Sequence, residues 1–301
     1  MKAIRSFVLS AMVMAGVAHA QQKNACPREV AEFAAVQQRA DANDAAAQTT
    51  LASCYDLGMH VAPNGKESIR LLSEAANQGY APAEYELGRI YLYGRGIPAD
   101  YAKALVWEQK AAEQGDPRAQ RDLAFMYERG LGVPADPARA AEWNRKAAAQ
   151  GNTEAQLQLA RALDQGSGVN KNPDEARRWY AKAAGAEQPA AQLALARKSL
   201  AEGNCPKAIH WFEEAAEHGN PEAMLGLGTL YKGGKCPRNS ERSLLWLTLG
   251  GRFGIQQSRA EAEKLANSLP NSTRTRVKSQ VEAWIKAHPG AEKEEDEEEE
   301  H

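Results

Sequence analysis

The sequence predicts an all-α protein, a right-handed α-solenoid of about six helix-loop-helix repeats with capping helices at both ends. Two observations predict it. The segment GRGIPADYAKALVWEQKAAEQG at 94–115 returns 36 residues later as GLGVPADPARAAEWNRKAAAQG at 130–151. The chain is also rich in Ala and poor in aromatic residues, at 7%, which favours helix over strand. A long segment that occurs twice in the sequence indicates stacked structural units, because each unit needs the same packing residues.

The first half of each repeat is predicted to be an amphipathic helix. In one repeat Ala83, Leu87, Gly88 and Tyr91 stand at spacing i, i+4, i+5, i+8, which is one face of a helix. Gly or Ala at the third of these places keeps that face thin, so a neighbouring helix can approach closely. The same set recurs in six blocks, at 44–79, 80–115, 116–151, 152–187, 188–219 and 220–254.

The second half of each repeat predicts another helix, marked by a column of Trp such as Trp107. Asp100 stands where its side chain can accept from the free amides of this helix, and Pro137 suits the first position of the next copy. Gly115 follows the helix, where a left-handed residue ends it. Each repeat is therefore expected to be helix, loop, helix and turn.

The two ends of the chain differ from the repeats. Residues 1–20 have Lys2 and Arg5, then an apolar run and Ala-His-Ala, which predicts a secretory signal peptide. The apolar run of about 11 residues is too short to span a membrane. We therefore expect an exported protein in the periplasm, with secretion from the cell as the alternative.

Capping segments are expected on both sides of the array. Residues 21–43 predict an N-terminal cap and 255–290 predict one or two C-terminal capping helices. Residues 291–301 hold eight acids and one Lys, which predicts a solvated, disordered tail. An open alternative is that this tail regulates binding by occupying basic residues of the array.

The repeat pattern A-x3-LG-x2-Y-x2-G-x-G-[IV]-x2-D-x3-A-x2-W-x3-AA-x2-G resembles the Sel1-like repeat family, a relative of tetratricopeptide repeats, over roughly 44–254. The G-x-G loop and the 36-residue period distinguish it from the 34-residue tetratricopeptide form. Two loops depart from the pattern, MHVAPNG at 59–65 and AEGNCPK at 201–207, and we expect these to lack the family's loop geometry.

The resemblance implies protein binding. Exported members of the family include immunity proteins that block a phospholipase effector delivered by type VI secretion, envelope adaptors, and secreted factors that engage host proteins. The expected function is therefore that of a non-enzymatic adaptor or inhibitor. An immunity protein, a host-interaction factor and a cell-wall-acting enzyme are the alternatives. The oligomeric state stays open.

Four cysteines in an exported chain predict two disulfides, for which three pairings are possible. Cys54 in the first repeat is four repeats from Cys205, too far for a bond in a solenoid. We therefore predict bonds between Cys26 and Cys54 and between Cys205 and Cys236, with unpaired buried thiols as the alternative.

Chemical motifs are scarce. The GRGIPA and GLGVPA loops lack the third glycine and the βαβ setting of a dinucleotide site. No H-E-x-x-H, C-x-x-C, Ser-x-x-Lys or G-x-S-x-G occurs, so neither a metal or other cofactor nor a serine acyl-enzyme is expected. The net charge of residues 21–290 is about +3, which argues against nucleic acid as a partner.

The remaining candidate is a surface on the first helices, which line the concave side in solenoids of helix pairs. Two rows of residues flank the repeated Leu: Ser53, Arg89, Phe125, Arg161, Arg197 and Thr229 after it, and Thr49, Tyr85, Arg121, Leu157, Leu193 and Leu225 before it. The candidate partner-binding residues are Tyr85, Arg89, Tyr93, Arg121, Phe125, Arg129, Leu157, Arg161 and Arg197.

Arg beside aromatic residues and Leu is typical of interface hot spots. The expected partner is another protein, such as an envelope protein or a secreted effector, with an acidic or extended segment. Two alternatives stay open: the leucines belong to the core between repeats, and the arginines only keep the surface soluble.

Overall fold

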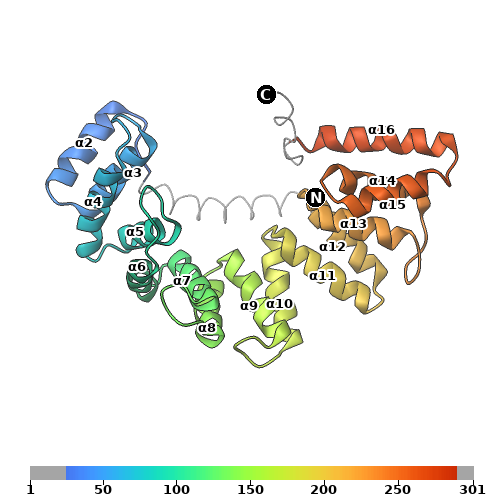
Figure 1. Cartoon of the computed structure of the whole chain (residues 1–301), viewed down its shortest axis with the longest axis horizontal. Coiled ribbons are helices and arrows are strands. Elements are labelled where there is room, and N and C mark those ends of the chain that lie inside the picture. Colours follow the sequence, from blue (N-terminus) through green and yellow to red (C-terminus); the bar gives the residue numbers. More distant parts are fainter. Residues whose placement is uncertain (1–24, 290–301) are drawn as a thin grey trace, which may run out of the picture. The chain divides into compact units, whose positions relative to one another are not determined.

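A computed structural model describes residues 25–289, which form fifteen helices and no strand within that range (Figure 1). The predicted all-α class is therefore confirmed. The expected signal peptide at 1–20 and the expected tail at 291–301 lie outside the described residues. The chain divides after Asn152 into two compact units, which are taken in turn.

In both units each helix packs against the next one along the chain, the order of an α-solenoid, except that the last helix of the second unit packs on the helix two places before it. The first unit contains α2 (Val30–Asp41), α3 (Ala45–Leu57), α4 (Gly65–Asn77), α5 (Ala81–Tyr93), α6 (Tyr101–Glu113), α7 (Pro117–Arg129) and α8 (Pro137–Ala149). The second contains α9 (Thr153–Gln165), α10 (Pro173–Gly185), α11 (Pro189–Ala201), α12 (Cys205–Glu217), α13 (Pro221–Tyr231), α14 (Ser240–Arg252), α15 (Gln256–Ala266) and α16 (Asn271–Ala287).

The helices begin and end where the capping residues predict. The Asp100 carboxylate accepts from the amide of Lys103, two residues into α6, and Asp136 accepts from the amides at the start of α8. Pro137 is the first residue of α8, where its missing N–H costs nothing. Gly115 has φ +95° after α6, a left-handed conformation that glycine adopts without strain.

A hydrogen bond between two side chains recurs in every repeat of the first unit. The amide nitrogen of Gln78 donates to Gln48 at 2.8 Å, that of Gln114 to Glu84 at 2.7 Å, and that of Gln150 to Gln120 at 2.9 Å. The three acceptors are buried residues of α3, α5 and α7. Each bond therefore joins the end of a second helix to the beginning of the first helix and satisfies a buried polar group.

The small residues on the first helices allow the close packing that the pattern predicts. A Cβ on Gly88 would stand 2.7 Å from the Glu108 side chain of α6. A Cβ on Gly228 would stand 2.6 Å from Leu247 of α14. Contacts of this length are closer than non-bonded atoms tolerate, so these glycines leave room for the facing side chains of α6 and α14.

Both disulfides join the pairs favoured by the sequence, Cys26 with Cys54 and Cys205 with Cys236. The first ties the segment before α2 to α3. The second ties the first residue of α12 to the loop after α13. Each therefore crosslinks segments about thirty residues apart, which restricts the unfolded chain.

The loop at 59–65 keeps more of the family geometry than expected. His60 occupies the place that Gly96 takes 36 residues later, and both are left-handed, with φ +63° and +74°. The His60 ring stacks on Phe33 of α2 at 5.0 Å between ring centroids, and its Nε2 lies 2.8 Å from the Pro27 carbonyl oxygen. These contacts offset the strain that a side chain brings at positive φ.

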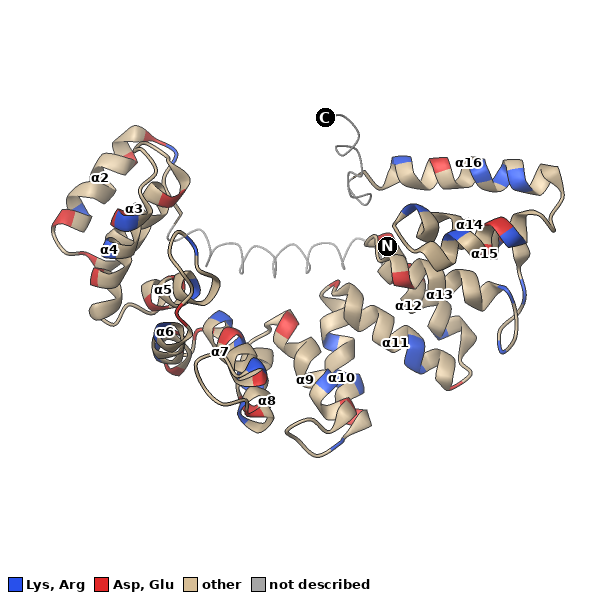
Figure 2. Cartoon of the chain, viewed as in Figure 1, with Lys and Arg blue, Asp and Glu red and all other residues tan. Residues whose placement is uncertain are grey.

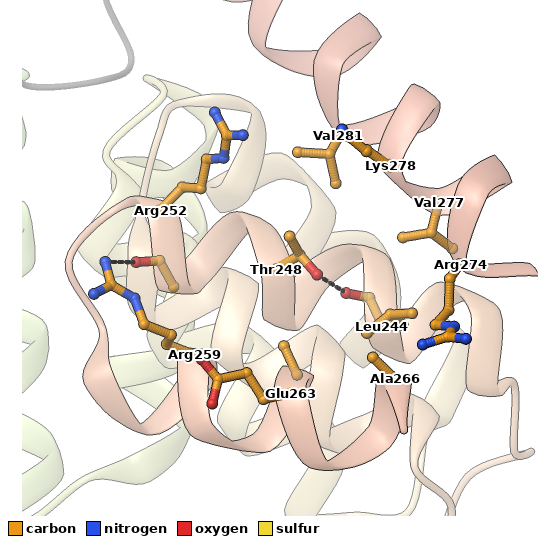
Figure 3. Close-up of a pocket in the computed structure, with 12 residues that line it drawn as sticks. Leu244, Thr248, Arg252, Arg259, Glu263, Ala266, Arg274, Val277, Lys278 and Val281 are labelled. Carbon is orange, nitrogen blue, oxygen red and sulfur yellow. Dashed lines mark hydrogen bonds between the residues drawn. The ribbon is translucent and has the colours of Figure 1, made fainter. Parts of the chain in front are cut away.

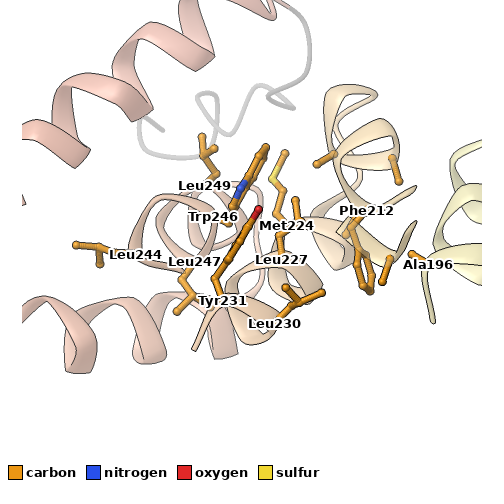
Figure 4. Close-up of a cluster of buried hydrophobic side chains, with 14 of the residues drawn as sticks. Ala196, Phe212, Met224, Leu227, Leu230, Tyr231, Leu244, Trp246, Leu247 and Leu249 are labelled. Atoms are coloured by element: carbon orange, nitrogen blue, oxygen red, sulfur yellow. The ribbon is translucent and has the colours of Figure 1, made fainter. Parts of the chain in front are cut away.

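The largest apolar core of the second unit surrounds α13 and α14, where Met224, Leu227 and Leu247 are fully buried (Figure 4). Trp284 of α16 packs edge-on against Phe253, 5.7 Å between ring centroids, and stacks on His288 at 4.0 Å. This aromatic contact attaches the last helix to the array, because the rings bury a large apolar area.

Gly132 tests the packing of successive loops. Its φ is +71°, and a Cβ there would stand 2.4 Å from the Tyr101 carbonyl oxygen. Gly96 is its counterpart one repeat earlier, with φ +74° and open space around the position. We expect Gly96→Ala to lower the free energy of unfolding by about 1 kcal/mol through backbone strain, and Gly132→Ala to lower it by at least about 1 kcal/mol more. Urea unfolding measures both, and equal losses would contradict the contact.

Candidate functional site

In the first unit, three candidate residues lie along one face of α5. Tyr85, Arg89 and Tyr93 are spaced at i, i+4 and i+8, and their exposure rises along the helix from 4% for Tyr85 to 48% for Tyr93. The Arg89 guanidinium carbon lies 5.6 Å from the Tyr85 ring centroid and 5.5 Å from that of Tyr93. These cation–π contacts orient Arg89.

The candidates on α7 continue this surface. Arg121 forms an ion pair with buried Asp122, 2.7 Å from Nη1 to Oδ1. Phe125 is half-buried, and the exposed Arg129 lies over its ring at 5.8 Å. Arg118, which the sequence did not single out, lies 4.2 Å from the Tyr85 ring centroid. α7 therefore supplies cations and one aromatic ring beside those of α5.

A cavity of about 260 Å³ opens on this surface, and Tyr85 and Arg89 line it. Thr49 and Ser53 of the same two rows line it too, with Asp56, Glu86 and Arg118. Among the described residues Arg89 makes no hydrogen bond or ion pair, and its Nε is shielded from solvent without a partner. Arg89 is therefore available for an acidic group of a ligand.

Two buried acids behind this surface were missed by sequence reasoning. Glu108 of α6 is 0% exposed, and neither carboxylate oxygen has a hydrogen-bond partner in the described part of the chain. Burial raises the pKa of Glu108 well above its ordinary value, and nearby Asp122 raises it further. Burial also raises the pKa of Asp122, which Arg121 and Arg89 partly offset.

A signal for Glu108 is present in the repeat alignment. Glu108 follows the Trp of the second helix, and the corresponding residues of the other repeats are all uncharged: Leu72, Asn144, Tyr180, Phe212 and Leu247. Glu108 is therefore the single acid at a repeat position that otherwise holds uncharged residues, which indicates a role beyond packing.

In the second unit the candidate leucine and arginines separate into core and surface. Leu157 of α9 is 2% exposed, so it belongs to the core, as one alternative held. Arg161 is exposed and has no hydrogen bond or ion pair within residues 25–289. Arg197 of α11 is 63% exposed and pairs with Glu222 of α13 at 2.8 Å.

Two cavities of this unit share Arg197 and Glu222. One, of about 420 Å³, also has Arg161, Leu193 and Tyr180 in its lining. The other, of about 530 Å³, is more apolar and is lined by Leu200, Phe212, Leu225, Gly226 and Thr229 among others. The two rows of first-helix residues thus line adjoining cavities along α9, α11 and α13.

The positions of Lys and Arg and those of Asp and Glu are interspersed along the helices of both units (Figure 2). Among residues 25–289 no cluster of three or more His, Cys, Asp or Glu side chains is arranged to hold a metal ion. No helix in the same range has the length and apolarity needed to cross a membrane.

Comparisons with known proteins give a consistent fold. The Sel1 repeat family model matches 45–80, 81–116, 117–152, 153–186, 189–220 and 221–252. A Sel1 repeat protein from Oxalobacter formigenes is 32% identical, with 71% of this chain and 88% of that chain covered and a TM-score of 0.61. A protective antigen with an SLR fold from uropathogenic Escherichia coli is 26% identical, with 84% and 70% covered and a TM-score of 0.50.

An immunity protein from Pseudomonas aeruginosa also matches, at 20% identity and a TM-score of 0.41, with 75% of this chain and 83% of that chain covered. A likeness at this level carries no functional argument. The search of curated proteins found no match.

Glu108 predicts a pH dependence of stability. Its pKa is raised in the folded state, so its contribution is fully present below the unfolded value near 4.5 and is lost as the pH rises through the folded value. We expect Glu108→Gln to gain at least about 1 kcal/mol over the parent between pH 4 and pH 7. The control is Glu142→Gln, at an exposed position on α8. Urea unfolding at both pH values measures the difference, and a difference independent of pH would contradict the role of burial.

Proposed function

The chain belongs to the Sel1 repeat family, and on that premise we propose that it is a non-enzymatic protein that binds another protein through its first helices. The observation that supports this most is where the cavities lie. In the first unit, Tyr85 and Arg89 of α5 line one. In the second, residues of α9, α11 and α13 supply most of the lining of two more.

The division between repeated and varied residues supports the same function. The repeated residues of the first helices are buried against their neighbours, as Leu87 and Leu123 show at 1% and 0% exposed. The residues two places later vary between repeats and reach the surface. A side chain that packing does not constrain is free to be selected for contact with a partner.

The chemistry of the surface favours an acidic partner segment. Arg89 and Arg161 have no ion-pair partner among the described residues, and each lines a cavity with a Tyr ring nearby. A guanidinium group donates to a carboxylate in a bidentate geometry while its face contacts aromatic rings. We propose that Asp or Glu side chains of the partner contact these two arginines.

Export is part of the proposal. The two disulfides are stable in an oxidising compartment, which agrees with the signal peptide expected at residues 1–20. Neutralising a secreted effector would be one form of this binding. The tagged mature chain can be used to capture its partner from periplasmic extract. If the chain neutralises a secreted effector, the captured protein will be that effector.

Neutralising the two unpaired arginines is expected to weaken binding. In the double variant Arg89→Gln and Arg161→Gln, the affinity for the captured partner should fall at least tenfold, as expected for the loss of about 1.4 kcal/mol or more at a hot spot. The matched control is the double variant Lys66→Gln and Arg178→Gln, which removes two exposed cations from the second helices α4 and α10.

Surface plasmon resonance measures both variants after circular dichroism has verified their folding. The control should keep the parent affinity. Equal affinity of all three proteins, or an equal loss in both double variants, would argue against the first-helix surface.

A further inference from the structure

A cavity of about 450 Å³ lies among α14, α15 and α16, apart from the residues proposed to bind protein (Figure 3). Its floor is apolar. Leu244 of α14, Ala262 of α15, and Val277 and Val281 of α16 line it, and each is less than 10% exposed. Figure 3 shows both valines pointing from α16 toward α14. Its volume falls in the range of small-molecule sites, about 300 to 1,000 Å³.

The rim of this cavity is basic. Arg252, Arg259, Arg274 and Lys278 line it, against one acid, Glu263. None of the four cations forms an ion pair within the described residues, and Arg259 only donates to the Gly251 carbonyl oxygen at 3.4 Å. Arg276, between Arg274 and Lys278 on the same helix, is paired instead: its Nε and Nη2 donate to the two carboxylate oxygens of Glu241, at 2.6 and 2.5 Å.

The polar groups of the floor already have hydrogen-bond partners within the protein. The Thr248 hydroxyl donates to the Leu244 carbonyl oxygen at 2.7 Å. A peptide inserted here would bring backbone N–H and C=O groups that the apolar floor cannot satisfy, whereas a hydrocarbon chain brings none. An anionic group at the rim would in turn meet the unpaired arginines, which favour bidentate contact with a carboxylate.

We propose that this cavity binds a medium-chain fatty acid, with the acyl chain against Leu244, Val277 and Val281 and the carboxylate at the basic rim. The proposal is independent of the protein-binding surface, since the two share no residues. The chemistry it needs is a single acyl chain with one anionic head. A free fatty acid and a lysophospholipid both carry that chemistry, and we commit to the fatty acid because it is the smaller of the two ligands for a cavity of about 450 Å³.

The test is calorimetric titration of laurate, below its micelle concentration, into the full mature chain. We expect one laurate per chain, and at least tenfold weaker binding of dodecanol, which has the same chain without the charge. The double variant Arg274→Gln and Lys278→Gln should also weaken laurate binding at least tenfold. The control, Lys264→Gln with Lys286→Gln, removes two exposed cations of α15 and α16 outside the lining and should leave the affinity unchanged.

A second variant separates loss of the site from loss of the fold. Ala266→Phe places a ring in the cavity without changing charge and should abolish binding at an unchanged melting temperature. Absence of laurate binding to the full chain would overturn the proposal. Equal affinity for dodecanol would overturn the role of the rim, and tighter binding of lauroyl lysophosphatidylglycerol would overturn the assignment to a fatty acid.

Discussion

The close approach of paired helices at one small residue is the constraint on which the rest of the structure depends. Gly88 admits the Glu108 side chain of the facing helix, and Gly228 admits Leu247. Where the position holds Ala, as at Ala124, Ala160 and Ala196, the side chain is 0% exposed. A larger residue there would separate the helices, expose the apolar faces and remove the packing that each repeat supplies to its neighbour.

Because of this constraint, some positions of each repeat maintain the packing and others are free to vary. Positions that determine helix spacing, capping and turns are repeated with little change, because every unit needs them. Positions that face outward vary, as Ser53, Arg89, Phe125 and Thr229 illustrate at one place in four of the repeats. Glu108 belongs to neither class, because it is an acid buried at a packing position. The charge of nearby Asp122 raises the pKa of Glu108, and both acids lie directly behind the surface that holds Arg89. The scaffold of the first unit and its candidate surface are therefore linked electrostatically.

Features with local causes could be predicted from the sequence. The helix of α6 begins at its Asp100 cap, and the disulfide partners follow from which repeats are adjacent. Features with tertiary causes could not. Tyr85 looks like a surface residue by its place in the repeat, yet Arg118 of the next first helix covers its ring. The cavity beside α16 has no periodic signal, because α15 and α16 lie beyond the repeats and their spacing depends on how Trp284 packs.

The most direct test of the account is hydrogen–deuterium exchange of the mature chain with and without its captured partner. Binding through the first helices predicts slower exchange in α5, α7, α9 and α11, with α6, α8 and α10 unchanged. Protection confined to the second helices, or equal in both sets, would contradict the claim that the varied residues of the first helices form the binding surface.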